Sequence, residues 1–301
     1  EILKIANKAK LVTTEKGKKY LSKIFNSEFS FLTVKDNDEI KNLKFIEAPM
    51  LHWPETMMTY MKNENILFSC DLFGAQIADS RIFADLIPNV MSYVKRYYAF
   101  IFRPFAYAVL NGLKKLEGLN INIIAPSHGP VWRTQAQIKD LINAYAKWSV
   151  NPEKEKAVVL YAGIWGATRK IAEAIADGLS SLEVKIYDLT NLTLIQWSDL
   201  MADLMEAKAI AIGSNTLIGQ MFPTVKTALQ LLKYINPKEK IGLVFGSYGW
   251  VGGAVKAIEN ELKNMGLNLI DSIEIQFNPN KNEIEKCFKL GEELAKKVKE
   301  V

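Results

Sequence analysis

The second half of the sequence predicts a doubly wound α/β sheet, and the first half predicts an α+β arrangement. In residues 151–301, five short apolar runs alternate with stretches of helical periodicity, as in a parallel sheet with helices on both faces. In residues 1–150, strand-like runs mostly come before the helical patterns, which favours separate layers. The polar stretch SVNPEKEK at 149–156 lies at the change and is typical of a linker.

The elements of the second half follow one another regularly. Strands are predicted where short apolar runs lie between turn residues, at 156–162, 184–189, 208–214, 240–247 and 267–276. Helices are predicted where apolar residues recur with helical spacing, at 168–180, 222–234, 251–265 and 281–300. Together they predict a five-stranded parallel sheet.

The elements of the first half are less regular. Strands are predicted from the runs AKLVTT, FLTV, KFIEAP, TMMTYM and NILFSC. Helical patterns then extend from about 77 to 117, and a strand at 120–126 and a helix at 134–148 follow. The opening residues EILKIANKAK look like the interior of a helix, because no capping residue precedes them.

The composition excludes several classes of protein. A length of 301 residues, 49% hydrophobic and 24% charged, is that of a globular protein with room for two domains. The net charge of +5 comes from scattered lysines, so we expect no nucleic-acid partner. The cysteines, Cys70 and Cys287, form no C-x-x-C pair, and no apolar run reaches the ~18 residues of a spanning helix. We therefore expect a reduced, cytoplasmic protein without a membrane partner.

Three glycine-containing loops follow the first, third and fourth predicted strands of the second half. They are Ala162–Thr168, Gly213–Gly219 and Gly246–Gly253. In an open parallel sheet, ligands bind beyond the carboxyl ends of the strands where the strand order reverses. The first loop can bind a phosphate through backbone N–H groups and a helix N-terminus, and the third carries two aromatic residues that can face a flavin ring.

Each loop alone could be an ordinary turn, but three at these strand ends favour a flavin site. A P-loop and a dinucleotide fingerprint are both absent from the sequence. The residues expected to bind the cofactor share these loops: Gly163, Ile164, Trp165, Gly166, Ala167, Thr168, Ser214, Asn215, Thr216, Leu217, Gly219, Ser247, Tyr248, Gly249, Trp250, Gly252 and Gly253.

The first half contains both histidines of the chain. His52 stands in LHWP, His128 in PSHG, and Asp71 in FSCDLFG directly after a predicted strand. A strand-to-loop junction can aim each side chain at a metal, and imidazole and carboxylate suit iron, zinc or manganese. Each residue could equally be an incidental loop residue or a cap.

These motifs resemble those of the flavodiiron proteins, or A-type flavoproteins. In that family, a flavodoxin-like domain follows a metallo-β-lactamase-like domain, and the phosphate loop usually reads Thr/Ser-x-Trp-Gly-Ser-Thr. The resemblance implies a partial metallo-β-lactamase-like αββα sandwich in residues 1–150, incomplete at its N-terminus. It further implies a flavodoxin-like domain, a doubly wound five-stranded parallel sheet binding FMN, in residues 151–301.

The resemblance also implies roles for the polar residues of the first half. His52 matches a ligand of one iron ion, His128 a ligand of a second, and Asp71 a carboxylate that bridges the two. The segment RYYAFIFRPF resembles the family stretch that places a tyrosine near the diiron pocket. Tyr97 or Tyr98 is expected there, with a core aromatic as the alternative.

Two departures from the family pattern matter. At Gly163 and Ala167 the phosphate loop lacks hydroxyl side chains, which predicts weaker FMN binding. The H-x-E-x-D-H motif, which supplies the other iron ligands, is absent, and the resemblance begins near Asn7. Three explanations are open: a fragment of a longer polypeptide, a separate chain that supplies the missing half-domain, or a lineage that lost its metal site.

The activity that the resemblance implies is reduction of O2 to water or of NO to N2O at a diiron site, with electrons delivered by FMN. The expected partners are a second copy, arranged head to tail, and an electron donor such as rubredoxin, reduced coenzyme F420 or a reductase. One alternative is a flavodoxin-like electron carrier with a vestigial or partner-completed metal domain. Another is a β-lactamase-fold hydrolase that uses metal-activated water.

Overall fold

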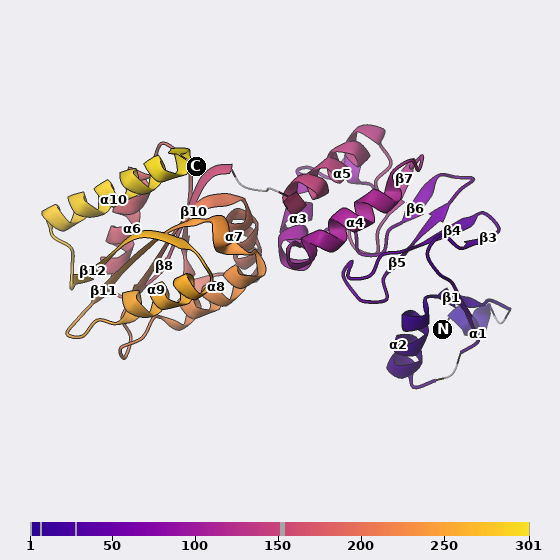
Figure 1. Ribbon diagram of the computed structural model, residues 1–301, viewed down its shortest axis with the longest axis horizontal. Helices are drawn as coiled ribbons and strands as arrows, with labels where there is room; N and C mark the ends of the chain where they lie inside the picture. The colour runs from indigo at the N-terminus through magenta and orange to yellow at the C-terminus, as the bar shows by residue number, and fades with distance from the viewer. Residues whose placement is uncertain (1, 7, 28, 151–153, 301) are drawn as a thin grey trace. The chain divides into compact units, whose positions relative to one another are not determined.

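A computed structural model of the chain describes residues 2–6, 8–27, 29–150 and 154–300. The chain divides into two compact units, residues 1–151 and 152–301 (Figure 1). The linker predicted at 149–156 lies partly outside the described residues, because it includes residues 151–153. Among the described helices, none combines the length and apolar character needed to cross a membrane.

The second unit contains a five-stranded, fully parallel sheet (Figure 1). Its strands are β8 (Lys154–Ala162), β9 (Glu183–Asp188), β10 (Ala207–Asn215), β11 (Ile241–Tyr248) and β12 (Asn268–Gln276). Their spatial order is β12-β11-β10-β8-β9. The second strand of the unit is therefore at one edge beside the first, which is the flavodoxin-like order. The predicted fold class of this half is confirmed, and each predicted strand is present.

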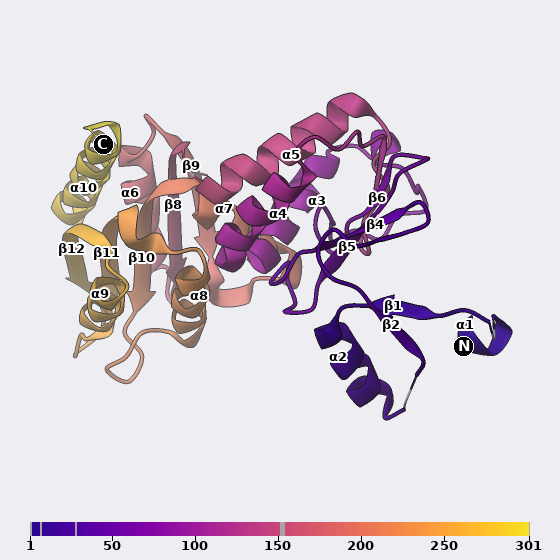
Figure 2. The ribbon, with the colours of Figure 1, turned by 45° about the vertical axis from the view of Figure 1, so that its right-hand side comes forward.

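Five helices cover the two faces of this sheet. They are α6 (Ala167–Gly178), α7 (Leu194–Glu206), α8 (Pro223–Tyr234), α9 (Ala254–Asn264) and α10 (Lys281–Glu300), with 3-10 turns η4 (Leu189–Asn191) and η5 (Pro237–Glu239). Helices α6 and α10 share one apolar core with alternate residues of β8, β10, β11 and β12. Helices α7, α8 and α9 pack on the other face (Figures 1 and 2). Both faces of the central strands β8, β10 and β11 are thus buried, as their continuous apolar sequences require.

The first unit contains one five-stranded mixed sheet and a group of helices on one side of it (Figures 1 and 2). Its strands are β3 (Glu39–Ile40), β4 (Leu43–Glu47), β5 (Met57–Met61), β6 (Ile66–Phe68) and β7 (Ile123–Ala125). The helical elements are η1 (Ala84–Leu86), α3 (Val90–Tyr97), the π-helical turn η2 (Tyr98–Phe102), η3 (Arg103–Phe105), α4 (Ala106–Leu116) and α5 (Gln135–Val150). A mixed sheet with helices on one side is the partial metallo-β-lactamase-like sandwich that the sequence predicts.

The N-terminal part of this unit forms a smaller sheet of its own. Its elements are α1 (Ile2–Ile5), β1 (Leu11–Thr13), α2 (Glu15–Phe25) and β2 (Phe31–Thr33), and β1 pairs with β2 in parallel. The expected helical opening is limited to the single turn α1. Residues 77–83, expected to be helical, are irregular instead, and α2 and α7 are helices that the sequence patterns did not predict.

The two faces of the mixed sheet differ in burial. On one face, Met58, Tyr60, Leu67 and Ile124 are buried. On the other face, Met61, Ile66 and Ile123 align across β5, β6 and β7 and stay partly exposed. Phe68, beside them on that face, is 42% exposed. The described residues therefore leave an apolar sheet face incompletely covered, which we call the open face (Met61, Ile66, Phe68 and Ile123).

A buried ion cluster joins three elements at the amino end of the second sheet. The side chain of Lys156 is 2% exposed, and its Nζ lies 2.6 Å from Asp203 Oδ1 and 3.0 Å from Glu183 Oε1. Glu206, itself 4% exposed, lies 3.6 Å from the same ammonium. Burial opposes the charge on Lys156, but the carboxylates outweigh it and raise the pKa of the ammonium above its usual value.

We expect Lys156→Met to destabilise the second unit by about 3 kcal/mol, because the largely buried carboxylate of Asp203 would lose its counter-charge. The measurement is urea unfolding followed by circular dichroism. Lys185→Ala, on the exposed side of neighbouring β9, is the control and should change stability by less than about 0.5 kcal/mol. Equal effects of the two substitutions would contradict the role assigned to the cluster.

Candidate functional site

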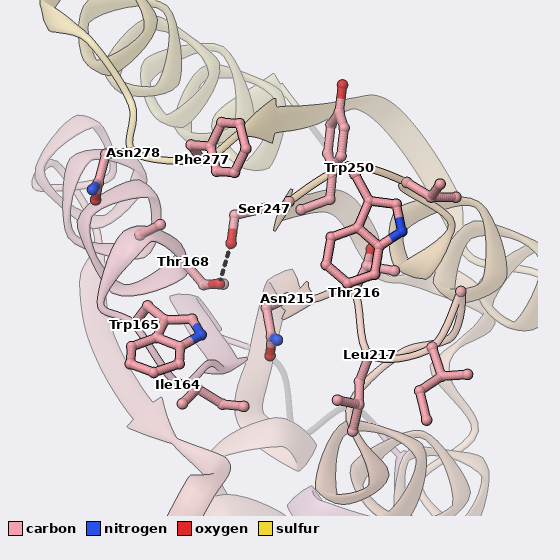
Figure 3. A pocket seen from close by; sticks show the side chains of 16 residues that line it. Ile164, Trp165, Thr168, Asn215, Thr216, Leu217, Ser247, Trp250, Phe277 and Asn278 are labelled. Carbon is pink, nitrogen blue, oxygen red and sulfur yellow. Dashed lines mark hydrogen bonds between the residues drawn. The ribbon is translucent and has the colours of Figure 1, made fainter.

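A cavity of about 820 Å³ lies at the carboxyl ends of β8, β10 and β11 (Figure 3). It is within the size range of small-molecule and cofactor sites. Twelve of the residues predicted to bind the cofactor line it: Ile164, Trp165, Ala167, Thr168, Asn215, Thr216, Leu217, Gly219, Ser247, Tyr248, Gly249 and Trp250. The three predicted loops therefore meet around one cavity.

Five residues of the predicted set do not line the cavity. They are Gly163, Gly166, Ser214, Gly252 and Gly253. Ser214 is buried, and its hydroxyl accepts a hydrogen bond from the backbone N–H of Phe222 at 2.8 Å, so it fixes the end of the second loop. Gly166 caps α6 with a positive φ of 83°, a conformation that glycine adopts without strain.

The floor of the cavity carries groups suited to an anion. Helix α6 begins here, and its cap residue Gly166 has no side chain to bond the first N–H groups of the helix. These N–H groups and the helix dipole favour a phosphate. The hydroxyls of Thr168 and Ser247 lie 2.8 Å apart at the same place (Figure 3), so at least one of them can turn toward a ligand.

The walls of the cavity suit a flat aromatic ligand. Trp165 and Trp250 stand on opposite sides of the cavity (Figure 3) and are 86% and 90% exposed. Between them, the Oδ1 atom of Asn215 is buried without a hydrogen-bond partner. A buried acceptor without a partner is costly unless a ligand or water satisfies it. Aromatic surface, an unpartnered amide oxygen and an anion-binding floor together fit FMN.

Four lining residues were not predicted from the sequence: Ile218, Val251, Phe277 and Asn278. Phe277 and Asn278 follow β12 directly, so the rule that ligands bind at the carboxyl ends of strands would have included them had it been applied to the fifth strand. Ile218 and Val251 lie at the tips of the second and third loops, where they are 94% and 60% exposed.

The first unit brings His52, Asp71 and His128 together. His52 lies in the loop between β4 and β5, Asp71 follows β6, and His128 follows β7. His52 Nε2 is 3.4 Å from Asp71 Oδ2, and His128 Nε2 is 3.4 Å from Asp71 Oδ1. Each imidazole thus faces a different oxygen of a carboxylate that is only 13% exposed.

Backbone contacts hold two of these loops together. The N–H of Ala75 donates to His128 O at 3.2 Å, and the N–H of Ser127 donates to Cys70 O at 2.7 Å. A Cβ atom on Gly129 would lie 2.8 Å from Ala75 N, so glycine is needed for this close approach. Burial and then the charge of Asp71 raise the pKa of the Cys70 thiol, which keeps it neutral beside the carboxylate.

Tyr97 and Tyr98 point to different surroundings. The ring of Tyr97 lies 6.2 Å from that of His128, and burial and the charge of Asp71 raise the pKa of its hydroxyl. The hydroxyl of Tyr98 lies 2.7 Å from Ser149 Oγ, and its ring packs 5.2 Å from that of Trp148. Tyr97 is therefore the tyrosine on the side of the histidines, and Tyr98 belongs to the aromatic core.

The chemistry of the three residues fits only part of a diiron centre. An ion on either side of Asp71 would receive one imidazole nitrogen and one oxygen of the shared carboxylate. Within the described part of the chain, no group of three or more His, Cys, Asp or Glu side chains could hold a metal ion. Non-haem iron usually has three or more protein ligands, so these residues do not fit two tightly held irons by themselves.

Comparison with known proteins assigns both units. Residues 1–129 match the family described as ODP family beta lactamase, and residues 159–291 match the family described as Flavodoxin. An uncharacterised protein of Methanocaldococcus jannaschii is 37% identical over 98% of this chain and 76% of its own length. The nitric oxide reductase of Moorella thermoacetica is 36% identical, over 90% of this chain and 70% of the enzyme.

Solved structures give the same result over nearly the whole chain. The rubredoxin oxygen:oxidoreductase of Desulfovibrio gigas matches with a TM-score of 0.90 and 28% identity, covering 97% of this chain and 75% of that protein. The flavodiiron protein of Giardia intestinalis matches with a TM-score of 0.91 and 30% identity, covering 97% and 74%. The chain belongs to the flavodiiron proteins. It is thereby assigned to a family of oxidoreductases, and the resemblance seen in the sequence is confirmed.

In this flavodiiron chain, we expect Tyr98→Phe to lower stability by about 1 kcal/mol, because it removes a buried hydrogen bond to Ser149. Tyr97→Phe is the matched control: it removes the neighbouring hydroxyl and leaves that bond intact. Denaturant unfolding of the first unit measures both. A larger loss for Tyr97→Phe would contradict the placement of the two side chains.

Proposed function

We propose that the second unit binds FMN and that the chain forms part of a flavodiiron reductase. The observation that carries the proposal is the cavity at the ends of β8, β10 and β11, in which a helix N-terminus without a side-chain cap, an unpartnered Asn215 oxygen and two indoles converge. The backbone of α6 and Thr168 would hold the phosphate, and Trp165 and Trp250 would flank the ring. Bound FMN supplies a group that takes up electrons and releases them singly or in pairs.

The proposed reaction is reduction of NO to N2O, or of O2 to water. Two molecules of NO with two electrons and two protons give N2O and one water; O2 with four electrons and four protons gives two waters. His52, Asp71 and His128 would contribute to the diiron site and Tyr97 would line it. Because these residues fit only part of such a site, a diiron centre would need further ligands from residues outside this sequence. The matched structures of the family are longer than this chain, which spans 75% of the Desulfovibrio gigas protein.

The proposed partners follow from the same assignment. We expect a head-to-tail homodimer, and an electron donor of the rubredoxin, reduced F420 or reductase type. The name of the Desulfovibrio gigas relative, rubredoxin oxygen:oxidoreductase, supports rubredoxin as the donor class. The expected compartment is the cytoplasm.

The second candidate is an FMN electron carrier whose metal domain is vestigial or completed by another chain. The observation that favours it is the incomplete ligand set around Asp71. The cavity of the second unit does not depend on that set, so a carrier could keep the flavin site unchanged.

The two candidates are separated by purifying the full gene product anaerobically, counting FMN and iron, and following NO consumption by the FMN-reduced protein. NO is the better substrate for the test, because free reduced flavins also react with O2. We expect about one FMN and two irons per protein chain and formation of N2O. Flavin without iron and without NO consumption would refute the reductase and leave the carrier.

We expect Ala167→Ser to tighten FMN binding about three- to tenfold, because it adds a hydroxyl donor in the first turn of α6. Gly163→Ser, which also adds a hydroxyl, should not tighten binding. Its Cβ would lie 2.8 Å from Thr168 Oγ1, so it would displace the hydroxyl that bonds Ser247. Titration of the apoprotein with FMN, followed by flavin fluorescence, measures both. Tighter binding by Gly163→Ser alone would contradict this picture of the phosphate site.

We expect this chain alone, incubated anaerobically with Fe(II) and desalted, to retain well below two irons per chain, since each ion would have too few ligands. Asp71→Asn should lower the retained iron further, because Asp71 faces both histidines. Asp140→Asn, on the exposed side of α5, is the control. Two tightly held irons in the unaltered chain would show that the three residues suffice.

A further inference from the structure

Strand β12 makes side-chain contacts with two of the cavity loops although its own side chains do not enter the cavity. It is the edge strand of the second sheet beside β11. Gly246 pairs with Glu274 and Tyr248 with Gln276. Because Glu274 and Gln276 are two residues apart, they lie on the same face of the strand. Neither of them lines the cavity.

These two side chains hold the part of the third loop that follows β11, Gly249–Gly253, at both of its ends. Gln276 Nε2 donates to the carbonyl oxygen of Gly249 at 2.9 Å. Glu274 Oε1 accepts from the backbone N–H of Gly253 at 3.1 Å. Between the two fixed ends lie Trp250 and Val251, which line the cavity and are 90% and 60% exposed. The loop that carries the Trp250 indole is therefore held by two side chains that lie outside the cavity.

Glu274 also connects the third loop to the second. The hydroxyl of Thr216 donates to Glu274 Oε1 at 3.4 Å and accepts from the backbone N–H of Ala254 at 3.2 Å. Thr216 lines the cavity, and Ala254 is the first residue of α9. A side chain of the second loop thus caps the helix that follows the third loop, and Glu274 bonds to both loops.

The charge of Glu274 suits this position. The cap residue of α9, Gly253, has no side-chain cap of its own, so the N-terminus of the helix leaves N–H groups and a partial positive charge available. A Cβ atom on Gly252 would clash with Glu274 Oε2, so the carboxylate packs directly on the loop backbone. A carboxylate is stabilised at a helix N-terminus more than a neutral amide is.

We propose that Glu274 and Gln276 are positioning residues for the flavin site, which hold the second and third loops in the shape that the ligand needs. The inference rests on the proposed function for the identity of the ligand, FMN. Both side chains lie at the surface, where each hydrogen bond contributes modestly. Their effect on binding is therefore a several-fold one, exerted through ordering of the loops before the ligand arrives.

The first test does not depend on FMN. Amide hydrogen exchange of the apoprotein should speed up at residues 250–254 in Glu274→Ala and in Gln276→Ala, and stay unchanged in α6 and α10. Glu274→Gln keeps an acceptor oxygen for Gly253 and should restore most of the protection. Glu293→Ala, an exposed carboxylate on α10, is the control. Unchanged exchange in both alanine variants would overturn the proposal.

The second test measures FMN binding and the midpoint reduction potential of the bound flavin. Glu274→Ala and Gln276→Ala should each weaken binding about three- to tenfold, and Glu274→Gln should weaken it less. Removing the negative charge in either Glu274 variant should raise the potential, since reduction adds negative charge, while Gln276→Ala should leave it unchanged.

The two failures are distinguishable. No FMN binding by the unaltered chain would refute the proposed function but leave the exchange test standing. Normal binding by the unaltered chain together with undiminished binding by both alanine variants would refute the positioning role alone. Equal loss of binding in Glu274→Ala and Glu274→Gln, with unchanged exchange, would also refute it.

Discussion

The position of β8 between β9 and β10 is the constraint on which the cavity of the second unit depends. From β8 the chain enters α6 on one face of the sheet, and from β10 it enters α8 on the other. The loops that leave these two neighbouring strands therefore diverge, which leaves space for a ligand at the carboxyl ends of the strands. The position of the α6 N-terminus at the cavity follows from this geometry, whereas Trp250 is placed by the loop after β11.

Both units place their candidate site residues in loops that follow strands. In the second unit, all of the cavity walls come from within the unit. In the first, the ends of β6 and β7 and the loop after β4 deliver a carboxylate between two imidazoles. The same sheet presents the open face, so within the described residues the first unit has too few candidate ligands for a metal ion and incomplete packing.

The sequence predicted the second unit well because its central strands β8, β10 and β11 are buried on both faces and read as apolar runs. Helix α7 escaped prediction because it passes into β10 without a loop, Glu206 being followed directly by Ala207. A Thr193–Gln196 capping box marked its start. The choice between Tyr97 and Tyr98 depended on the helical phase at the π-helical turn, which periodicity does not resolve. Glu274 and Gln276 look like ordinary solvent-facing strand residues, and only the folded loops reveal their contacts.

The open face has a practical consequence for work with the isolated chain. Phe68 and its apolar neighbours Met61, Ile66 and Ile123 offer water a contiguous hydrocarbon surface in the native state. Environment-sensitive dyes such as ANS bind surfaces of this kind. The folded chain will therefore fluoresce with such a dye before any unfolding occurs. A dye-based melting curve will start from a high baseline, and the intrinsic tryptophan signal or circular dichroism will report its thermal transition more faithfully.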